Sequence, residues 1–171
     1  MAVSLRTTLE VKATETGSGA LGIPVKVHVF NHEGAAGANF RVFATGTGSN
    51  QQDLVHSDTI SLAGATTGLD VAGGLTDAFG TAITMVEVTS ITIVNNSTTT
   101  TEVVTIGAAT NPLLNWIAAS GDGVVIGPGG VFHISSPIDG FAVTAGTGDI
   151  LTLDPGADTI SVDYIICGRS A

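Results

Sequence analysis

Apolar and polar residues alternate with a period of two through the first thirteen residues, and this alternation constrains the fold more than any other feature. One face of such a segment would hold Val3, Leu5, Thr7, Leu9, Val11 and Ala13, and the other Ser4, Arg6, Thr8, Glu10 and Lys12. The same pattern returns at residues 25–29 and 160–166. Because successive side chains of a β-strand point to opposite faces, the pattern predicts strands with one buried face.

The composition favours a chain built of strands and turns. The sequence contains 24 Thr, which favours strands, and 23 Gly, which favours turns. Apolar runs flanked by turn residues predict eight further strands, at Phe40–Thr45, Leu54–Leu62, Thr84–Asn95, Thr101–Ile106, Val124–Ile126, Val131–Ser135, Phe141–Thr144 and Ile150–Leu153. We therefore predict an all-β, single-domain antiparallel fold, a β-sandwich or a barrel, with at least eight strands and less than about 15% helix.

Three local features add detail to this fold. The apolar phase slips between Val88 and Ile91, which predicts either a bulge near Thr89–Ser90 or burial of both faces of that strand. The Gly-Pro-Gly-Gly sequence at residues 127–130 predicts a type II turn. An asparagine followed by a proline predicts a short helical turn at Asn111–Ala119.

Charged residues are few and unevenly distributed. Only 12% of the residues are charged, and the net charge is −10. Residues 1–41 hold four of the five cations and carry +1, whereas residues 42–171 carry −11. Such an acidic body repels nucleic acid and anionic membranes, so neither is an expected partner. The low charged fraction instead predicts a surface that is buried against other copies of the chain.

The residue types that form catalytic and metal sites do not occur in recognisable patterns. His28, His32 and Glu33 have a spacing that suits a metal site on a helix, but residues four apart in a strand are roughly 13 Å from each other. The glycine-rich segments at residues 46–48 and 146–148 lack the lysine of a phosphate loop. We therefore expect no catalytic residue, no metal and no cofactor, and we do not expect an enzyme.

The remaining reactive side chains also have structural explanations. The carboxylates of Asp149, Asp154, Asp158 and Asp163 match no EF-hand spacing and are expected to be solvated turn residues. Cys167 is the one cysteine, so no disulfide forms within the chain, and its apolar neighbours predict an inert buried thiol. The N-terminus lacks the apolar segment of a signal peptide, and no apolar run approaches the ~20 residues of a membrane helix, which predicts synthesis in the cytosol.

Several segments resemble a family of small virion proteins of tailed bacteriophages and prophages. These segments are Leu69–Gly80, Ile93–Ser97, Gly129–Phe132, Gly140–Asp149 and Val162–Gly168, and the likeness extends over roughly residues 40–171. The resemblance implies a β-sandwich, often a jelly roll, on the outer surface of the capsid. It further implies a decoration, or cement, protein that forms homotrimers and binds the major capsid protein between neighbouring capsomers.

Two other functions stay open for such a chain. One is a tail or fibre component of the same virion, although the sequence contains no long repeat and no coiled-coil segment. The other is a carbohydrate-binding β-sandwich module, for which Trp116 is the one candidate aromatic platform.

The N-terminal segment is the predicted place of contact with a lattice. Residues 1–22 form a candidate docking strand or arm, followed by a β-sandwich domain at residues 23–171. An extended strand can add to the edge of a partner's sheet, and basic residues beside it can approach partner carboxylates. The residues expected to bind the partner are Val3, Leu5, Arg6, Leu9 and Lys12. In the alternative, residues 3–13 form an inner strand of the chain's own domain.

Overall fold

The structure is a computed structural model that describes the backbone of residues 5–8, 10–16, 25–31, 40–107 and 110–171, with side chains for residues 43–107 and 110–171. The chain divides into two compact units, Ser4–Phe43 and Ala44–Ala171, which are considered separately below. The division between the units therefore falls after Phe43. The predicted boundary at residue 22 lies outside the described residues.

Every regular element in the described residues is a β-strand, which confirms the predicted all-β class. The first strands are β1 (Leu5–Thr8), β2 (Glu10–Thr16), β3 (Val25–Asn31) and β4 (Phe40–Thr45), the last of which extends into the larger unit. The larger unit adds β5 (Gln51–Gln52), β6 (Leu54–Ala63), β7 (Thr67–Asp70), β8 (Leu75–Thr76), β9 (Ala82–Ile83), β10 (Glu87–Asn95), β11 (Val104–Gly107), β12 (Gly123–Ile126), β13 (Val131–Ser135), β14 (Phe141–Ala142), β15 (Ile150–Asp154) and β16 (Thr159–Arg169).

The smaller unit consists of antiparallel strand pairs. β2 and β3 form a two-stranded ribbon with seven paired positions, from Glu10 opposite Asn31 to Thr16 opposite Val25. β1 pairs with β4 instead. The alternating segment at residues 3–13 therefore contributes to two strands with different partners, and β3 lies in this unit and not in the sandwich.

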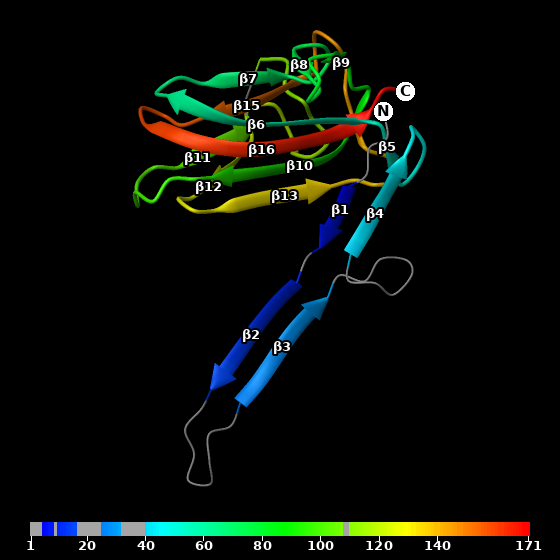
Figure 1. The fold of residues 1–171 in the computed structure, drawn as a ribbon. Helices are drawn as coiled ribbons and strands as arrows, with labels where there is room; N and C mark the ends of the chain where they lie inside the picture. Colours follow the sequence, from blue (N-terminus) through cyan, green and yellow to red (C-terminus); the bar gives the residue numbers. More distant parts are fainter. Residues whose placement is uncertain (1–4, 9, 17–24, 32–39, 108–109) are drawn as a thin grey trace, which may run out of the picture. The chain divides into compact units, whose positions relative to one another are not determined.

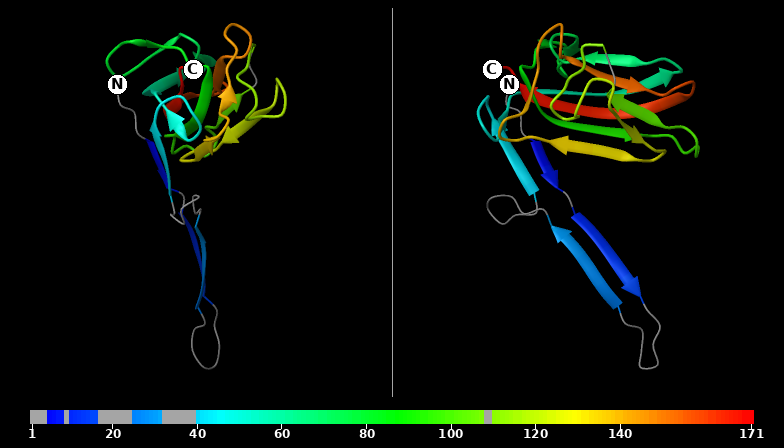
Figure 2. Two further views of the ribbon diagram at one scale, coloured as in Figure 1. Left: turned by 90° about the vertical axis from the view of Figure 1, so that its right-hand side faces the viewer. Right: turned by 180° about the vertical axis from the view of Figure 1, so that it is seen from behind.

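Nine strands of the larger unit form two antiparallel sheets (Figures 1 and 2). One sheet has the order β13-β10-β16-β6, with β14 also paired to β10, and the other has the order β12-β11-β15-β7. The pairing is nested, because β6 pairs with β16, β7 with β15, β10 with β13 and β11 with β12. A long hairpin that folds over on itself in this way has the strand order of an eight-stranded jelly roll.

The two sheets share one apolar core. Inward positions on β10 and β16, including Ile91, Ile93 and Ile166, are fully buried. They belong to the same cluster as Ile106 and Leu153 of the opposite sheet. Since burial of one such side chain stabilises the fold by about 1.5–3 kcal/mol, this shared core holds the sheets together.

Strand β10 shows why its apolar pattern slips. The register with β16 shifts between Val88 and Ser90, which confirms the predicted bulge. Thr89 and Ser90 are buried, as are Val88 and Ile91, so both faces of the strand are covered at this point. Both explanations of the slipped phase therefore hold.

The Gly-Pro-Gly-Gly turn between β12 and β13 has the predicted geometry. The Gly130 amide donates to the Gly127 carbonyl at 2.9 Å. Gly129 has a φ of 68°, and the third residue of a type II turn requires such a positive value.

The predicted helical turn at Asn111–Ala119 is wrong. Asn111 and Asn115 have φ values of 57° and 69°, which lie outside the right-handed helical region. Pro112 instead forms a parallel bridge with Ile150 at the start of β15. Pairing with a core strand outweighs the local preference of the Asn-Pro sequence for a helix start.

Candidate functional site

The outward side of the β13-β10-β16-β6 sheet carries very little charge. Residues opposite each other in an antiparallel ladder point to the same side of the sheet. Ile91 and Ile93 point into the core, so Thr92, Val94 and their register partners point outward. The outward side chains, called the outer face below, are Ser57, Thr59, Ser61, Thr92, Val94, Val131, His133, Ser135, Ser161, Asp163 and Ile165. Asp163 is the one carboxylate among these residues.

Three aliphatic side chains lie on the outer face among polar residues. Val131 and Ile165 are 64% and 43% exposed. Val94 is half-buried and lies opposite Val131 in the β10·β13 ladder, while Thr92 lies opposite Ile165 in the β10·β16 ladder. Exposed aliphatic side chains on neighbouring strands are typical of a surface that binds another protein.

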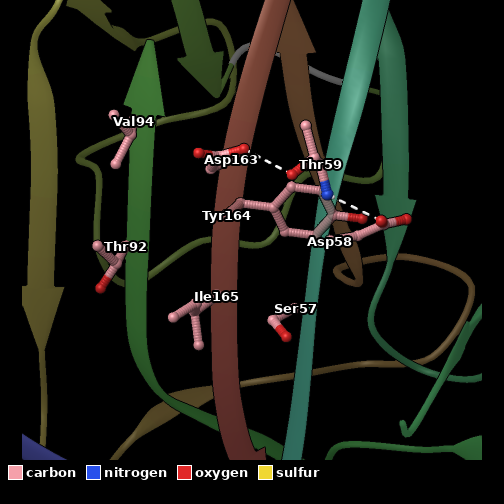
Figure 3. Close-up of a pocket in the computed structure, with 8 residues that line it drawn as sticks. All are labelled: Ser57, Asp58, Thr59, Thr92, Val94, Asp163, Tyr164 and Ile165. Carbon is pink, nitrogen blue, oxygen red and sulfur yellow. Dashed lines mark hydrogen bonds between the residues drawn. The ribbon is translucent and has the colours of Figure 1, made fainter. Parts of the chain in front are cut away.

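An open depression of about 390 Å³ lies over the strands β6, β16 and β10 (Figure 3). Its lining consists of Ser57, Asp58, Thr59, Thr92, Val94, Asp163, Tyr164 and Ile165. Thr59 Oγ1 donates to Asp163 Oδ1 at 2.6 Å and so links β6 to β16. The lining combines hydroxyl groups and aliphatic carbon with two carboxylates, and it contains no cation.

The titratable groups of the outer face have shifted pKa values with clear causes. Hydrogen bonds from Thr59 and then Asn96 hold the pKa of Asp163 below its ordinary value, so this carboxylate is charged at neutral pH. Desolvation by neighbouring groups lowers the pKa of His133, so its imidazole is neutral at pH 7. His133 Nδ1 lies 2.8 Å from Thr92 Oγ1. The outer face therefore carries a single negative charge at pH 7.

The sequence did not reveal the outer face. Val131 and His133 alternate with Phe132 and Ile134 along β13, and both sets contain apolar residues. The alternation predicts a strand, but it does not tell which set faces the core. Only the pairing of Phe132 with Ile93 shows that Val131 points outward.

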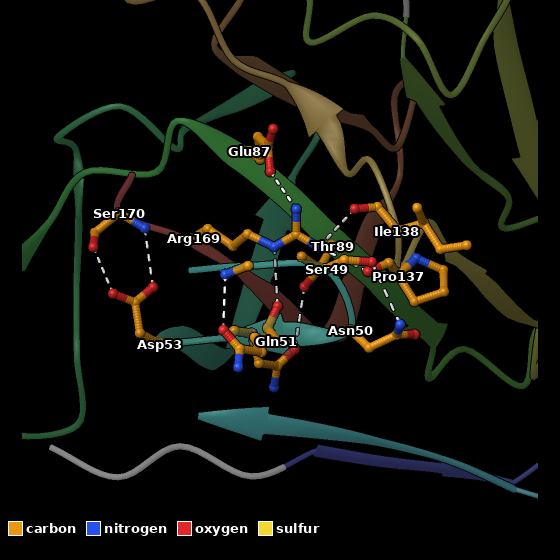
Figure 4. A network of polar contacts seen from close by, with 12 residues as sticks. Ser49, Asn50, Gln51, Asp53, Glu87, Thr89, Pro137, Ile138, Arg169 and Ser170 are labelled. Carbon is orange, nitrogen blue, oxygen red and sulfur yellow. Dashed lines mark hydrogen bonds and ion pairs between the residues drawn. The ribbon is translucent and has the colours of Figure 1, made fainter. Parts of the chain in front are cut away.

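A network of polar contacts closes one end of the sandwich (Figure 4). Arg169 Nε donates to the Gln51 carbonyl at 3.0 Å, and Nη2 donates to the Pro137 carbonyl at 2.7 Å. Arg169 is buried, and its Nη1 forms an ion pair with Glu87. By sequence, Arg169 is the one cation of residues 44–171, so the larger unit presents no exposed Lys or Arg.

Three of the five predicted partner-binding residues lie in described strands. Leu5 and Arg6 are in β1, and Lys12 is in β2. Val3 and Leu9 lie outside the described residues. The structure therefore places part of the predicted docking segment in a unit separate from the sandwich, and contact with a partner remains a prediction.

The β2·β3 ribbon pairs Val11 with Phe30 and Lys12 with Val29 in its backbone register. Among the described strands, no third strand extends this ribbon. Isolated two-stranded ribbons are only marginally stable in water.

Among the residues whose side chains the structure describes, His56, His133 and Cys167 each have different partners. His28 lies in β3, while His32 and Glu33 lie outside the described residues. The His56 side chain of β6 contacts β8 and β16. Its Nδ1 is 2.6 Å from the Thr76 carbonyl, and its Nε2 is 3.0 Å from the Tyr164 hydroxyl. Cys167 is buried, as predicted, and burial raises the pKa of its thiol.

Two of the four carboxylates near the C-terminus, Asp149 and Asp154, hold turns. The prediction of solvated turn residues is wrong for Asp149, which is buried, and for Asp163, which lies within β16. Asp154 Oδ1 accepts a hydrogen bond from the Gly156 amide at 2.9 Å, and Asp149 accepts one from the Gly146 amide. Within the described residues, no group of three or more His, Cys, Asp or Glu side chains is arranged to hold a metal ion. The same part of the chain contains no helix long and apolar enough to cross a membrane.

The side chain of Trp116 packs against other residues of the sandwich. Its Nε1 donates to the Leu113 carbonyl at 2.9 Å, and its ring lies 5.6 Å from that of Phe132. Both contacts turn the half-buried indole toward the chain itself. This arrangement does not favour Trp116 as a platform for a sugar ring.

Comparison of the chain with models of known families, with curated proteins and with solved structures finds no match. The resemblance of residues 40–171 to phage virion proteins therefore stays a prediction, as do the partners that it implies.

Proposed function

We propose that this chain is a structural virion protein that decorates and stabilises a bacteriophage capsid as a homo-oligomer bound between capsomers. The division of charge between its two units carries this proposal. Residues 4–43 hold four of the five cations, whereas residues 44–171 hold twelve of the fifteen carboxylates. A chain divided in this way can keep an acidic body in solution while a separate, less acidic element contacts a protein lattice.

The β2·β3 ribbon and β1 are the docking element in this proposal. Unpaired edges of a two-stranded ribbon can form backbone hydrogen bonds with a partner's sheet, while Arg6 and Lys12 approach its carboxylates. The sandwich of residues 44–171 is the acidic body in this proposal. The choice of a capsid as the lattice comes from the resemblance of residues 40–171 to phage virion proteins, and a tail component of the same virion is the second candidate.

The first test measures binding to phage particles assembled without this protein. Purified protein is added to these particles, and the bound copies are counted after sedimentation. We expect saturation at hundreds of copies per particle and a higher temperature of particle disruption. Saturation at a handful of copies would support the tail component, and no binding would overturn both assignments.

A pair of variants with equal net charge tests the docking element. The double change Arg6→Gln and Lys12→Gln removes two positive charges from the smaller unit, and Thr98→Glu with Thr100→Glu adds two negative charges to an exposed loop of the sandwich. We expect the first pair to weaken particle binding about tenfold, equivalent to about 1.4 kcal/mol, and the second to leave it unchanged. Equal losses of particle binding by the two double variants would show that binding depends only on the net charge of the chain.

A further inference from the structure

Three aliphatic side chains of the outer face are available for contact with a partner. Val131 stands on the edge strand β13, Val94 on the adjacent β10 and Ile165 on β16, so the three lie on neighbouring strands. Removal of their aliphatic surface from water favours binding to another protein. We infer that the outer face is the surface through which copies of this chain associate with one another.

The charge of the chain favours a second copy as the occupant of this surface. Each copy carries −10, so two copies repel each other unless the surfaces in contact are nearly uncharged. Two larger units cannot form ion pairs across their contact, because Arg169 is their one cation and it is buried. The outer face holds one carboxylate, Asp163, which already accepts a hydrogen bond from Thr59, and Asp58 is the one further carboxylate that lines the depression. A basic protein would instead be attracted to surfaces richer in carboxylates.

The opposite sheet offers a contrast within the same molecule. Val125 on β12 is 62% exposed, nearly as much as Val131. Its direct outward neighbour is Thr105, and the same side of that sheet carries Asp70 and Asp154. Val125 therefore matches Val131 in residue type and exposure but lies on the opposite sheet, away from the outer face, which makes it a control position.

The outer face also has matching convex and concave parts. Val131 projects from the edge strand, and the depression of about 390 Å³ lies over the other three strands of the sheet. The edge of one copy can therefore enter the depression of the next. Contacts between different parts of the same face are head-to-tail, and they produce closed rings when the rotation between copies permits.

The test compares Val131→Asp with Val125→Asp in the full chain by multi-angle light scattering at micromolar concentration. We expect the unmodified protein and Val125→Asp to exceed the monomer mass of 17.0 kDa, and Val131→Asp to shift to the monomer. A monomeric unmodified protein overturns the inference. So does an equal effect of the two substitutions, whether both dissociate the assembly or neither does.

A milder pair of variants introduces no charge at either position. Val131→Cys and Val125→Cys each introduce one exposed thiol, while the native Cys167 is buried. If copies cover the outer face, we expect alkylation at position 131 to be about tenfold slower than at position 125 in concentrated protein. Equal alkylation rates at the two positions overturn the inference.

These experiments rest on the self-association contained in the proposed function, but neither uses a capsid. Failure of the protein to bind phage particles would remove the capsid role and leave the surface assignment unaffected. Conversely, equal masses for Val131→Asp and Val125→Asp would remove the surface assignment and leave the capsid role unaffected. The two proposals therefore fail separately.

Discussion

Arg169, the last residue of β16, forms an ion pair with Glu87, the first residue of β10, and only 3% of the Arg169 side chain is exposed. The remaining guanidinium donors bind the backbone carbonyls of Gln51, Pro137 and Ile138. One buried cation thus joins the final strand to three segments far from it in sequence. Because the charge is paired and four guanidinium N–H groups have acceptors, the network stabilises this end of the sandwich as a unit.

Removal of this cation should destabilise the fold. Arg169→Leu leaves the Glu87 carboxylate and three carbonyls without their donors, so we expect the free energy of unfolding to fall by about 2–3 kcal/mol. Arg169→Lys keeps the charge but not the planar set of donors, and should cost about half as much. Urea denaturation measures both values. Thr100→Ala, on an exposed loop, serves as the control, and an Arg169→Leu value equal to it would contradict the expectation.

A methyl group at Gly168 should strain the pairing of β10 with β16. A Cβ atom there would lie 2.5 Å from the Glu87 carbonyl oxygen and 2.6 Å from Met85 Sδ. The carbonyl belongs to the adjacent strand and cannot move without disturbing the ladder, so we expect Gly168→Ala to lower the unfolding free energy by about 1–3 kcal/mol. Gly127→Ala is the control, because a Cβ atom at Gly127 would meet nothing within 4 Å. Equal thermal unfolding of the two variants would refute this expectation.

Cys167 should link stability to alkaline pH. Burial raises the pKa of its thiol, so the folded state holds the proton more tightly than the unfolded state does. This contribution is present in full below the pKa of the unfolded thiol, about 8.5, and is lost as the pH rises through the higher folded value. We expect the unfolding free energy of Cys167→Ser to decrease less between neutral and alkaline pH than that of the unmodified protein. Parallel pH profiles would contradict the assignment.

Asp77 should be required for the turn between β8 and β9. Its Oδ1 accepts hydrogen bonds from the amides of Phe79 and Thr81, both at 2.9 Å. The side chain of Phe79 in this turn is 81% exposed. Asp77→Ala leaves these amides without an acceptor, so we expect a loss of about 1–2 kcal/mol. Asp122→Ala removes an exposed carboxylate of equal charge and should have little effect. Hydrogen exchange at Phe79 and Thr81 should accelerate only in the first variant; unchanged exchange would refute the role of Asp77.

Strand positions could be predicted wherever the local pattern was long enough. The predicted strands Phe40–Thr45 and Val131–Ser135 coincide with β4 and β13 at both ends, because turn residues flank each apolar run. The strands β5, β8 and β9 contain two residues each and are too short to show a period. The Asn111–Ala119 segment was mistaken for a helical turn because its cap-like start is a local signal, whereas its bridge to β15 is not.

The sequence by itself determined the all-β class and the separation of cations from carboxylates, because alternation and charge are properties of each segment alone. Only the tertiary structure decided which strands pair and which side of each strand faces the core. His56 and Ile166 are opposite each other in the β6·β16 ladder although they are 110 residues apart. The free energy that selects such a pair comes from burying both sheets against one shared core. No single segment determines which of its sides faces the core, because that depends on the pairing of the strands of both sheets. The residues of the outer face could therefore be identified only in the folded chain.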